Sequence, residues 1–173
     1  MGAKFLIVYA TRTGTTRKVA EALAAALHGD IEAIEEPRGR GGPLGYLRSL
    51  IEARRGLAAP IEPGKRDPAA YDLVVLGTPV WGWSLSSPMR AYLLAAKRQL
   101  PAVAFFCTLG GSGAERAFAQ MSEAAGAKPR ATCAITVREV SLGTFALRVA
   151  EFARKIQEAA DALAEARASA KVL

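Results

Sequence analysis

The sequence contains few of the residues on which metal sites and disulfide frameworks depend. It has two cysteines, Cys107 and Cys133, and a single histidine, His28, in 173 residues. Cysteines this few and this far apart do not make a disulfide framework or a zinc site, and they suit a reducing compartment such as the cytoplasm. A Gly-x-Ser-x-Gly segment is also missing, and His28 lies in no catalytic context. We therefore predict neither a catalytic side chain nor a metal ligand.

Long apolar stretches are missing too. No run approaches the roughly 18 apolar residues that a membrane span requires, and Lys4 leads directly into the short run Phe5–Tyr9, with no secretory signal pattern. With 51% hydrophobic and 23% charged residues, the composition excludes a disordered chain. The length predicts one domain over residues 1–173, with a tail that frays after about residue 164.

Acidic residues are outnumbered, and this gives the chain a formal net charge of +7. Much of the excess lies between residues 38 and 66, where Glu52 and Glu62 are the only carboxylates. We interpret this basic stretch as a solvated surface insert, with a grip on a cofactor phosphate as the alternative. No zinc-finger, RNP or helix-turn-helix pattern accompanies it, so no nucleic-acid partner is predicted. The basic residues are Arg38, Arg40, Arg48, Arg54, Arg55, Lys65 and Arg66.

Short apolar runs alternate with helical patterns along the chain. Strands are predicted at 6–9, 73–76, 103–106 and 133–137, with a weaker one at 31–34. Apolar residues at helical spacing predict a helix after each, and another over 44–55. Unalternating strands are typical of parallel sheets with helices on both faces, so we predict a doubly wound α/β fold. Ligands bind such sheets at the carboxyl ends of the strands.

The loop after the first strand carries hydroxyl groups and one glycine directly before a helix. Hydroxyls, backbone N–H groups and the positive end of the helix dipole together favour an anion. The loop lacks both the triphosphate and the dinucleotide glycine patterns, which favours a monophosphate. The alternative is that these residues only cap the helix. They are Thr11, Arg12, Thr13, Gly14, Thr15 and Thr16.

Two further loops carry unusual residues. The loop after the third strand holds two tryptophans between glycine and proline residues, which suits a planar ring, although one tryptophan could instead belong to the core. The loop after the fourth strand is rich in glycine, so its backbone can approach a ligand closely. The candidate residues are Thr78, Pro79, Val80, Trp81, Gly82 and Trp83 in the first of these loops, and Thr108, Leu109, Gly110, Gly111, Ser112 and Gly113 in the second.

The segment from Ile7 to Thr16, followed by Ala20 and Leu23, resembles the flavodoxin signature. The resemblance implies a flavodoxin-like five-stranded parallel sheet in the order 2-1-3-4-5. It also implies FMN as the cofactor, with its phosphate at residues 11–16 and its isoalloxazine ring at residues 78–83 and 108–113. It does not decide which tryptophan stacks on the ring.

Two departures from carrier flavodoxins bear on function: the 108–113 loop has no aromatic residue, and the net charge is positive rather than acidic. Both favour an FMN-dependent oxidoreductase that takes electrons from a reduced nicotinamide or a partner protein and passes them to a quinone-like or protein acceptor. A plain electron-shuttle flavodoxin and a cofactor-less interaction domain remain alternatives. A phosphoacceptor switch is disfavoured because the strand ends at residues 10–12 and 77–78 carry no carboxylate.

Overall fold

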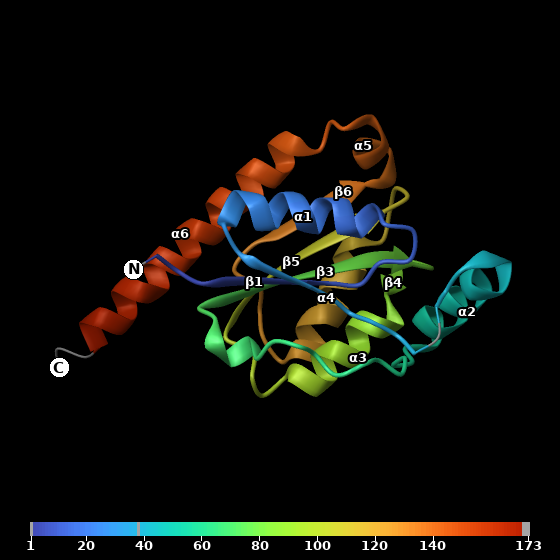
Figure 1. Ribbon diagram of the computed structural model, residues 1–173, viewed down its shortest axis with the longest axis horizontal. Coiled ribbons are helices and arrows are strands. Elements are labelled where there is room, and N and C mark those ends of the chain that lie inside the picture. The colour runs from blue at the N-terminus through green and yellow to red at the C-terminus, as the bar shows by residue number, and fades with distance from the viewer. Residues whose placement is uncertain (1, 38, 171–173) are drawn as a thin grey trace.

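The computed structural model describes residues 2–37 and 39–170, and it shows a parallel sheet with helices on both faces (Figure 1). The strand order is β2-β1-β3-β5-β6, which in chain order is the predicted 2-1-3-4-5. Arg38, one of the basic residues of the predicted insert, lies outside the described residues. The five parallel strands are β1 (Phe5–Tyr9), β2 (Asp30–Ala33), β3 (Leu73–Trp81), β5 (Ala102–Leu109) and β6 (Thr132–Thr136).

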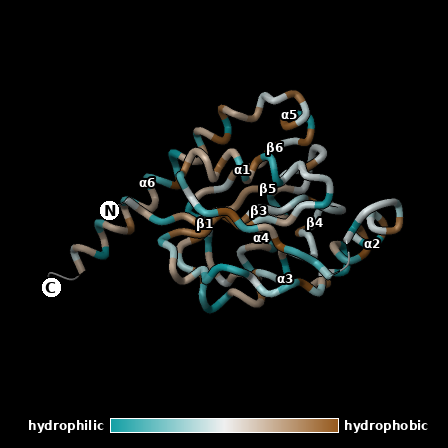
Figure 2. The backbone as a smooth tube through the Cα atoms, viewed as in Figure 1, coloured by the Kyte–Doolittle hydropathy of each residue, from teal (hydrophilic) through white to brown (hydrophobic). Residues whose placement is uncertain are grey.

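The three central strands are apolar because helices cover both of their faces. All five residues of β1 are buried, as are the first six of β3. The edge strands β2 and β6 are partly exposed and carry more polar residues. Hydrophobic residues accordingly gather along the centre of the sheet (Figure 2). Parallel strands buried on both faces need no alternation of polar and apolar residues, and this explains the sequence pattern.

Two helices cover each face of the sheet. On one face, α1 (Thr15–Leu27) and α6 (Ala146–Ala170) bury Leu23 and Phe152 against β1 and β3. On the other, α3 (Ser87–Ala96) and α4 (Ala114–Ala125) bury Met89 and Met121. Helix α6 continues past residue 164, after which fraying was expected, to Ala170. Within the described residues, no helix combines the length and the apolar character needed to cross a membrane.

The segment after Gly77 is a strand and a tight turn, and the prediction of a loop over 77–83 was wrong. β3 continues to Trp81 and pairs back on the two-residue strand β4 (Ser84–Leu85). The turn residues Gly82 and Trp83 both have positive φ, 54° and 60°, as the hairpin turn that suits twisted strands requires. Pro79 is tolerated in β3 because β1 stops pairing at Gly77, which leaves an edge there.

Helix α5 (Val137–Leu142) was also missed, since the sequence pattern placed Val137 in a strand. A capping box starts this helix: the Thr136 hydroxyl accepts from the Glu139 N–H, and Glu139 accepts from the Thr136 N–H. A short 3-10 turn, Pro68–Ala70, precedes β3. Helix α2 (Gly42–Arg55) begins two residues before the predicted 44–55 and stands at one end of the molecule, beside β4 (Figure 1).

Candidate functional site

The three candidate loops meet at the carboxyl ends of β1, β3 and β5. The Thr16 and Thr108 hydroxyl oxygens are 2.8 Å apart, which joins the start of α1 to β5. The Trp83 indole Nε1 donates to the Ser112 Oγ at 2.9 Å, which joins the β3–β4 turn to the loop after β5 (residues 110–113, the glycine loop). The fold therefore brings together three segments whose paired residues are 92 and 29 positions apart in the sequence.

The β1–α1 loop leaves the first turn of α1 without a side-chain cap. Gly14 is the N-cap residue with φ 88°, and a Cβ placed on it would meet nothing within 4 Å. Its N–H donates to the Thr11 Oγ1 at 3.0 Å, while the Thr13 and Thr15 hydroxyls lie 3.4 Å apart. The interpretation that these residues only cap the helix therefore has no hydrogen bond to support it. Exposed hydroxyls beside an uncapped helix N-terminus are suited to an anion.

Two residues of this loop have other roles. Thr16 is buried, with 1% of its surface exposed, and its hydroxyl is occupied by Thr108. The Arg12 guanidinium lies 5.1 Å from the centre of the Tyr46 ring on α2, within cation–π range. Thr16 thus fixes the loop to the sheet, and Arg12 connects it to α2.

The structure distinguishes the two tryptophans. Trp81 is buried, and the Arg40 guanidinium lies 5.0 Å from the centre of its ring. Trp83 is 54% exposed, and the Arg54 guanidinium lies 5.5 Å from its ring centre. Trp81 is therefore the core residue of the pair, and Trp83 is the one that can contact a ligand at the surface.

The remaining candidates divide into supporting and accessible residues. Thr78 is fully buried, and its hydroxyl lies 2.8 Å from the Ser86 Oγ, which holds the base of the hairpin. Thr108 and Leu109 are buried in β5, whereas residues 110–112 are exposed. At Gly113, with φ 102°, an added Cβ would lie 2.9 Å from the Trp83 Cα, so the hairpin packs directly on the start of α4. Like α1, α4 has no side-chain cap.

Arg40 is a residue that the sequence analysis misjudged. It was counted in a solvated insert, but its side chain is only 3% exposed. Its guanidinium donates to Glu36 at 2.5 Å, to Glu52 at 2.6 Å and to the Ser87 Oγ at 2.9 Å. This Arg40 cluster, formed by Arg40, Glu36, Glu52 and Ser87, fastens α2 to the start of α3 beneath Trp81. The sequence contained one signal, because Glu36 lies four residues before Arg40.

The charges in the Arg40 cluster stabilise one another. Burial disfavours the charged form of Glu52, but hydrogen bonds from Ser87, Arg40 and Arg48 outweigh it and lower the Glu52 pKa. Burial likewise disfavours charged Arg40, and hydrogen bonds to Glu36 and Glu52 outweigh it, so the Arg40 pKa is raised. Arg40 and Glu52 are therefore both ionised at neutral pH.

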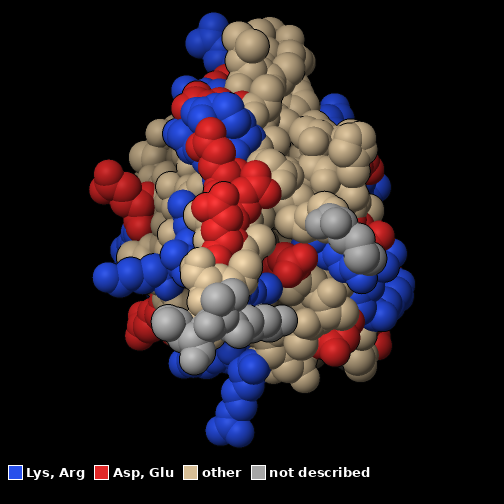
Figure 3. All heavy atoms as spheres, turned by 90° about the vertical axis from the view of Figure 1, so that its left-hand side faces the viewer, with Lys and Arg blue, Asp and Glu red and all other residues tan. Residues whose placement is uncertain are grey.

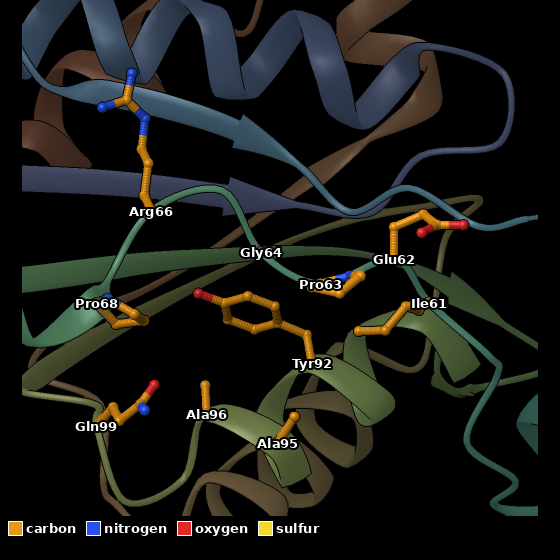
Figure 4. A pocket seen from close by; sticks show the side chains of 10 residues that line it. All are labelled: Ile61, Glu62, Pro63, Gly64, Arg66, Pro68, Tyr92, Ala95, Ala96 and Gln99. Carbon is orange, nitrogen blue, oxygen red and sulfur yellow. The ribbon is translucent and has the colours of Figure 1, made fainter.

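Two cavities differ in their relation to the candidate loops. One, of about 460 Å³, borders the glycine loop and is lined by Ser112, Gly113, Arg116 and Arg148, among others. The other, of about 340 Å³, lies between α3 and the segment before β3, with Tyr92 at its centre (Figure 4). None of the candidate loop residues lines this second cavity.

The two cysteines are unsuited to nucleophilic chemistry. Burial raises the pKa of Cys107 to about 12 and that of Cys133 to about 11. Both thiols are therefore protonated at neutral pH, whereas the reactive form of cysteine is the thiolate.

Comparison with known proteins identifies the class to which this architecture belongs. The sequence model of a flavodoxin family matches residues 4–132, which include β1, β3, β5 and all three candidate loops. The chain therefore belongs to the flavodoxin family. No curated protein sequence matches the chain.

Solved structures resemble the fold at low sequence identity. A flavoprotein from Lactobacillus acidophilus, solved in complex with FMN, is 23% identical with a TM-score of 0.69, over 83% of this chain and 99% of that one. A WrbA-like flavodoxin from Agrobacterium tumefaciens is 15% identical with a TM-score of 0.60, over 92% and 98% of the two chains. The flavodoxin of Megasphaera elsdenii is 20% identical with a TM-score of 0.55, over 87% and 98%. At these identities the likeness describes the fold.

Proposed function

We propose that this chain binds FMN at the carboxyl end of its sheet and uses it to transfer electrons. The observation that carries the proposal is the β1–α1 loop, where hydroxyl groups surround a helix N-terminus that no side chain caps. Membership of the flavodoxin family and the FMN complex of the Lactobacillus acidophilus flavoprotein support it.

The residues present fit the two parts of FMN. Thr13, Gly14 and Thr15 would hold the phosphate, because the hydroxyls and the first amides of α1 are donors beside open space. Trp83 and the glycine loop 110–112 would contact the ring, Trp83 through its exposed indole and the loop through its backbone. Thr16, Thr78 and Trp81 would support the site from beneath. When bound, FMN supplies the redox chemistry, and the chain supplies binding, orientation and electrostatics.

We further propose an oxidoreductase that takes electrons from a reduced nicotinamide or a partner protein and delivers them to a quinone-like or protein acceptor. The cavity of about 460 Å³ beside the glycine loop has room for a second molecule, and Arg116 and Arg148 line it. A plain electron shuttle is the second candidate, because the exposed helix α2 next to Trp83 suits contact with another protein.

The first experiment is a visible absorbance spectrum of the purified protein, followed by FMN titration of the apo form while tryptophan fluorescence is recorded. We expect flavin bands and strong quenching. The double variant Thr13→Glu/Thr15→Glu places two carboxylates at the phosphate position and should weaken FMN binding by at least 100-fold. Thr132→Glu, at an exposed position at the amino end of β6 and away from the candidate loops, is the charge control and should bind FMN with wild-type affinity.

Four results would decide between these proposals and their alternatives. Failure of the wild type to bind FMN would favour the cofactor-less interaction domain. Unchanged affinity of the double variant would place the phosphate elsewhere. Reduction of bound FMN by neither NADH nor NADPH would favour the protein donor, and a lack of quinone reduction as well would favour the plain shuttle.

A further inference from the structure

The outer face of α2 is apolar although it faces solvent. Leu44, Leu47 and Ile51 are 82%, 53% and 41% exposed. Their spacing of three and then four residues places them on one stripe of the helix, while Ser49 and Ala53 on the opposite side are buried. The stripe therefore faces away from the protein's own core. Exposed apolar side chains that form a contiguous patch indicate an interaction surface more often than scattered ones do.

Arginines flank this stripe, and no carboxylate shares its face. Arg55 lies on one side and Arg54 on the other, by the helical spacing, whereas the charge of Arg48 is paired with Glu52 at 2.7 Å. The only carboxylate of α2, Glu52, is directed to Arg40, Arg48 and Ser87 in the Arg40 cluster. The exposed surface of α2 is therefore apolar at its centre and positively charged at its sides.

The opposite end of the molecule carries a different charge pattern. There, acidic side chains form a dense group among lysines and arginines (Figure 3). That end therefore carries charges of both signs, whereas the charged side chains beside the α2 stripe are arginines, which would attract an acidic partner.

Helix α2 adjoins the proposed ring site. An ideal Cβ on Gly82 would lie 3.2 Å from the Arg54 Cγ and 3.5 Å from a Leu50 methyl group. Arg54 also covers the Trp83 ring, and Tyr46 lies beneath Arg12 of the β1–α1 loop. A protein seated on α2 would be next to Trp83 and the glycine loop. This is where electrons would enter or leave.

We propose that α2 is the docking surface for an acidic redox protein, with the Leu44–Leu47–Ile51 stripe as its apolar centre and Arg54 and Arg55 as its charged rim. The inference rests on the proposed function and names the chemistry of its partner protein. Apolar contact surrounded by complementary charge is typical of transient protein complexes, in which charge accelerates encounter.

Two other occupants fit the surface less well. The three side chains of the stripe hold about a dozen carbons, comparable with a single acyl chain, which gives only marginal membrane binding. A second copy of this chain would bring its own net charge of +7 to a positive face, so like charges would oppose the contact. An acidic protein can pair with the arginines and also cover the apolar stripe.

The test is the rate at which an acidic two-iron ferredoxin, reduced beforehand, reduces the FMN-loaded protein in a stopped-flow instrument. Two reduced ferredoxins, each oxidised by one electron, and two protons from water account for one fully reduced flavin. Because screening removes attraction between surface charges, we expect the rate constant to fall at least tenfold between about 10 mM and 300 mM salt. A basic cytochrome c, used as an acceptor from the reduced protein, should show the opposite salt dependence.

A matched pair of variants locates the surface. Leu47→Ser/Arg55→Glu removes one apolar and one basic side chain from α2, and neither residue is part of the proposed cofactor site. Leu94→Ser/Arg98→Glu makes the same chemical change at exposed positions of and just after α3. At low salt, the rate constant for reduction by ferredoxin should fall at least fivefold in the α2 variant and should stay within twofold of the wild-type value in the α3 variant. FMN affinity and reduction by a small photoreductant should not change in either.

The outcomes separate this inference from the proposed function. If the wild type does not bind FMN, the proposed function fails and no ferredoxin rate exists. If FMN binds but the rate constant for reduction by ferredoxin changes equally in the two variants, or does not depend on salt, docking on α2 is overturned. Co-sedimentation with phosphatidylserine vesicles that the α2 variant abolishes would replace the protein partner with a membrane surface, and dimerisation that it abolishes would replace it with a second copy.

Discussion

Replacing Arg40 with methionine would test the energetic role of the Arg40 cluster directly. Methionine keeps much of the apolar volume but leaves Glu36 and Glu52 without their main partner. Removing one member of a buried ion pair costs about 3 to 5 kcal/mol. Arg48 still contacts Glu52 at 2.7 Å and Glu36 at 3.8 Å, so the lower end, about 3 kcal/mol, is expected.

The loss of stability in Arg40→Met should be seen first in α2, because the Arg40 cluster holds this helix to α3. We expect urea unfolding to show a lower free energy of unfolding, and amide exchange to show that α2 loses protection before the central strands do. Arg40→Lys keeps the charge but not the planar donor fork, so its loss should be intermediate. Arg98→Met, at an exposed position, should change stability by no more than about 0.5 kcal/mol.

The effect of Arg40→Met should depend on pH. In the wild type the Glu52 pKa is lowered, so its stabilising contribution is complete above its ordinary pKa and is lost as pH falls through the lowered value. Without Arg40, burial favours the neutral carboxyl, which needs no partner. The difference in free energy of unfolding between variant and wild type should therefore become smaller from pH 7 to pH 4. A difference below 1 kcal/mol at pH 7, or one that does not become smaller, would refute this account.

Two further predictions concern the site loops and the thiols. Gly113→Ala should destabilise the protein by about 2 kcal/mol or more and weaken FMN binding at least tenfold, because its φ is 102° and its Cβ would crowd Trp83. Gly39→Ala, which has open space around it and lies outside the proposed cofactor site, is the control in the same titration. Cys107, which is buried, should react with a disulfide reagent at pH 8 only as fast as the protein unfolds, and Cys133, which is partly exposed, should react more slowly than a free thiol because its pKa is raised to about 11. Labelling of Cys107 faster than unfolding, or of Cys133 at the rate of a free thiol, would contradict this.

The strand order and the location of the candidate loops could be predicted because they depend on local patterns. Unalternating apolar runs such as Phe5–Tyr9 indicate strands buried on both faces, and such sheets have their ligand loops at one end. The loop chemistry was visible as well, since hydroxyls and glycines before a helix are close together in sequence.

The tertiary arrangement of charges and aromatics could not be predicted in the same way. A count of charges cannot show that Arg40 is buried, because its partners Glu52 and Ser87 are 12 and 47 residues away. Trp81 and Trp83 look equivalent in the sequence, and only the hairpin turn between β3 and β4 separates them into a buried and an exposed residue. The strand β4 has two residues, too few for any periodicity.

The turn at Gly82–Trp83 makes the two sides of the proposed ring site unequal in stiffness. A two-residue turn has no spare length, and the adjoining strands fix its ends, so the Trp83 backbone can move little without breaking the pairing of Val80 with Leu85. The facing segment, residues 110–112, has two glycines with open space around them. When a ligand binds, most of the ordering entropy must therefore be lost on the glycine side. Substitutions that restrict residues 110 and 111 would tune affinity through that entropy and leave the tryptophan side unchanged.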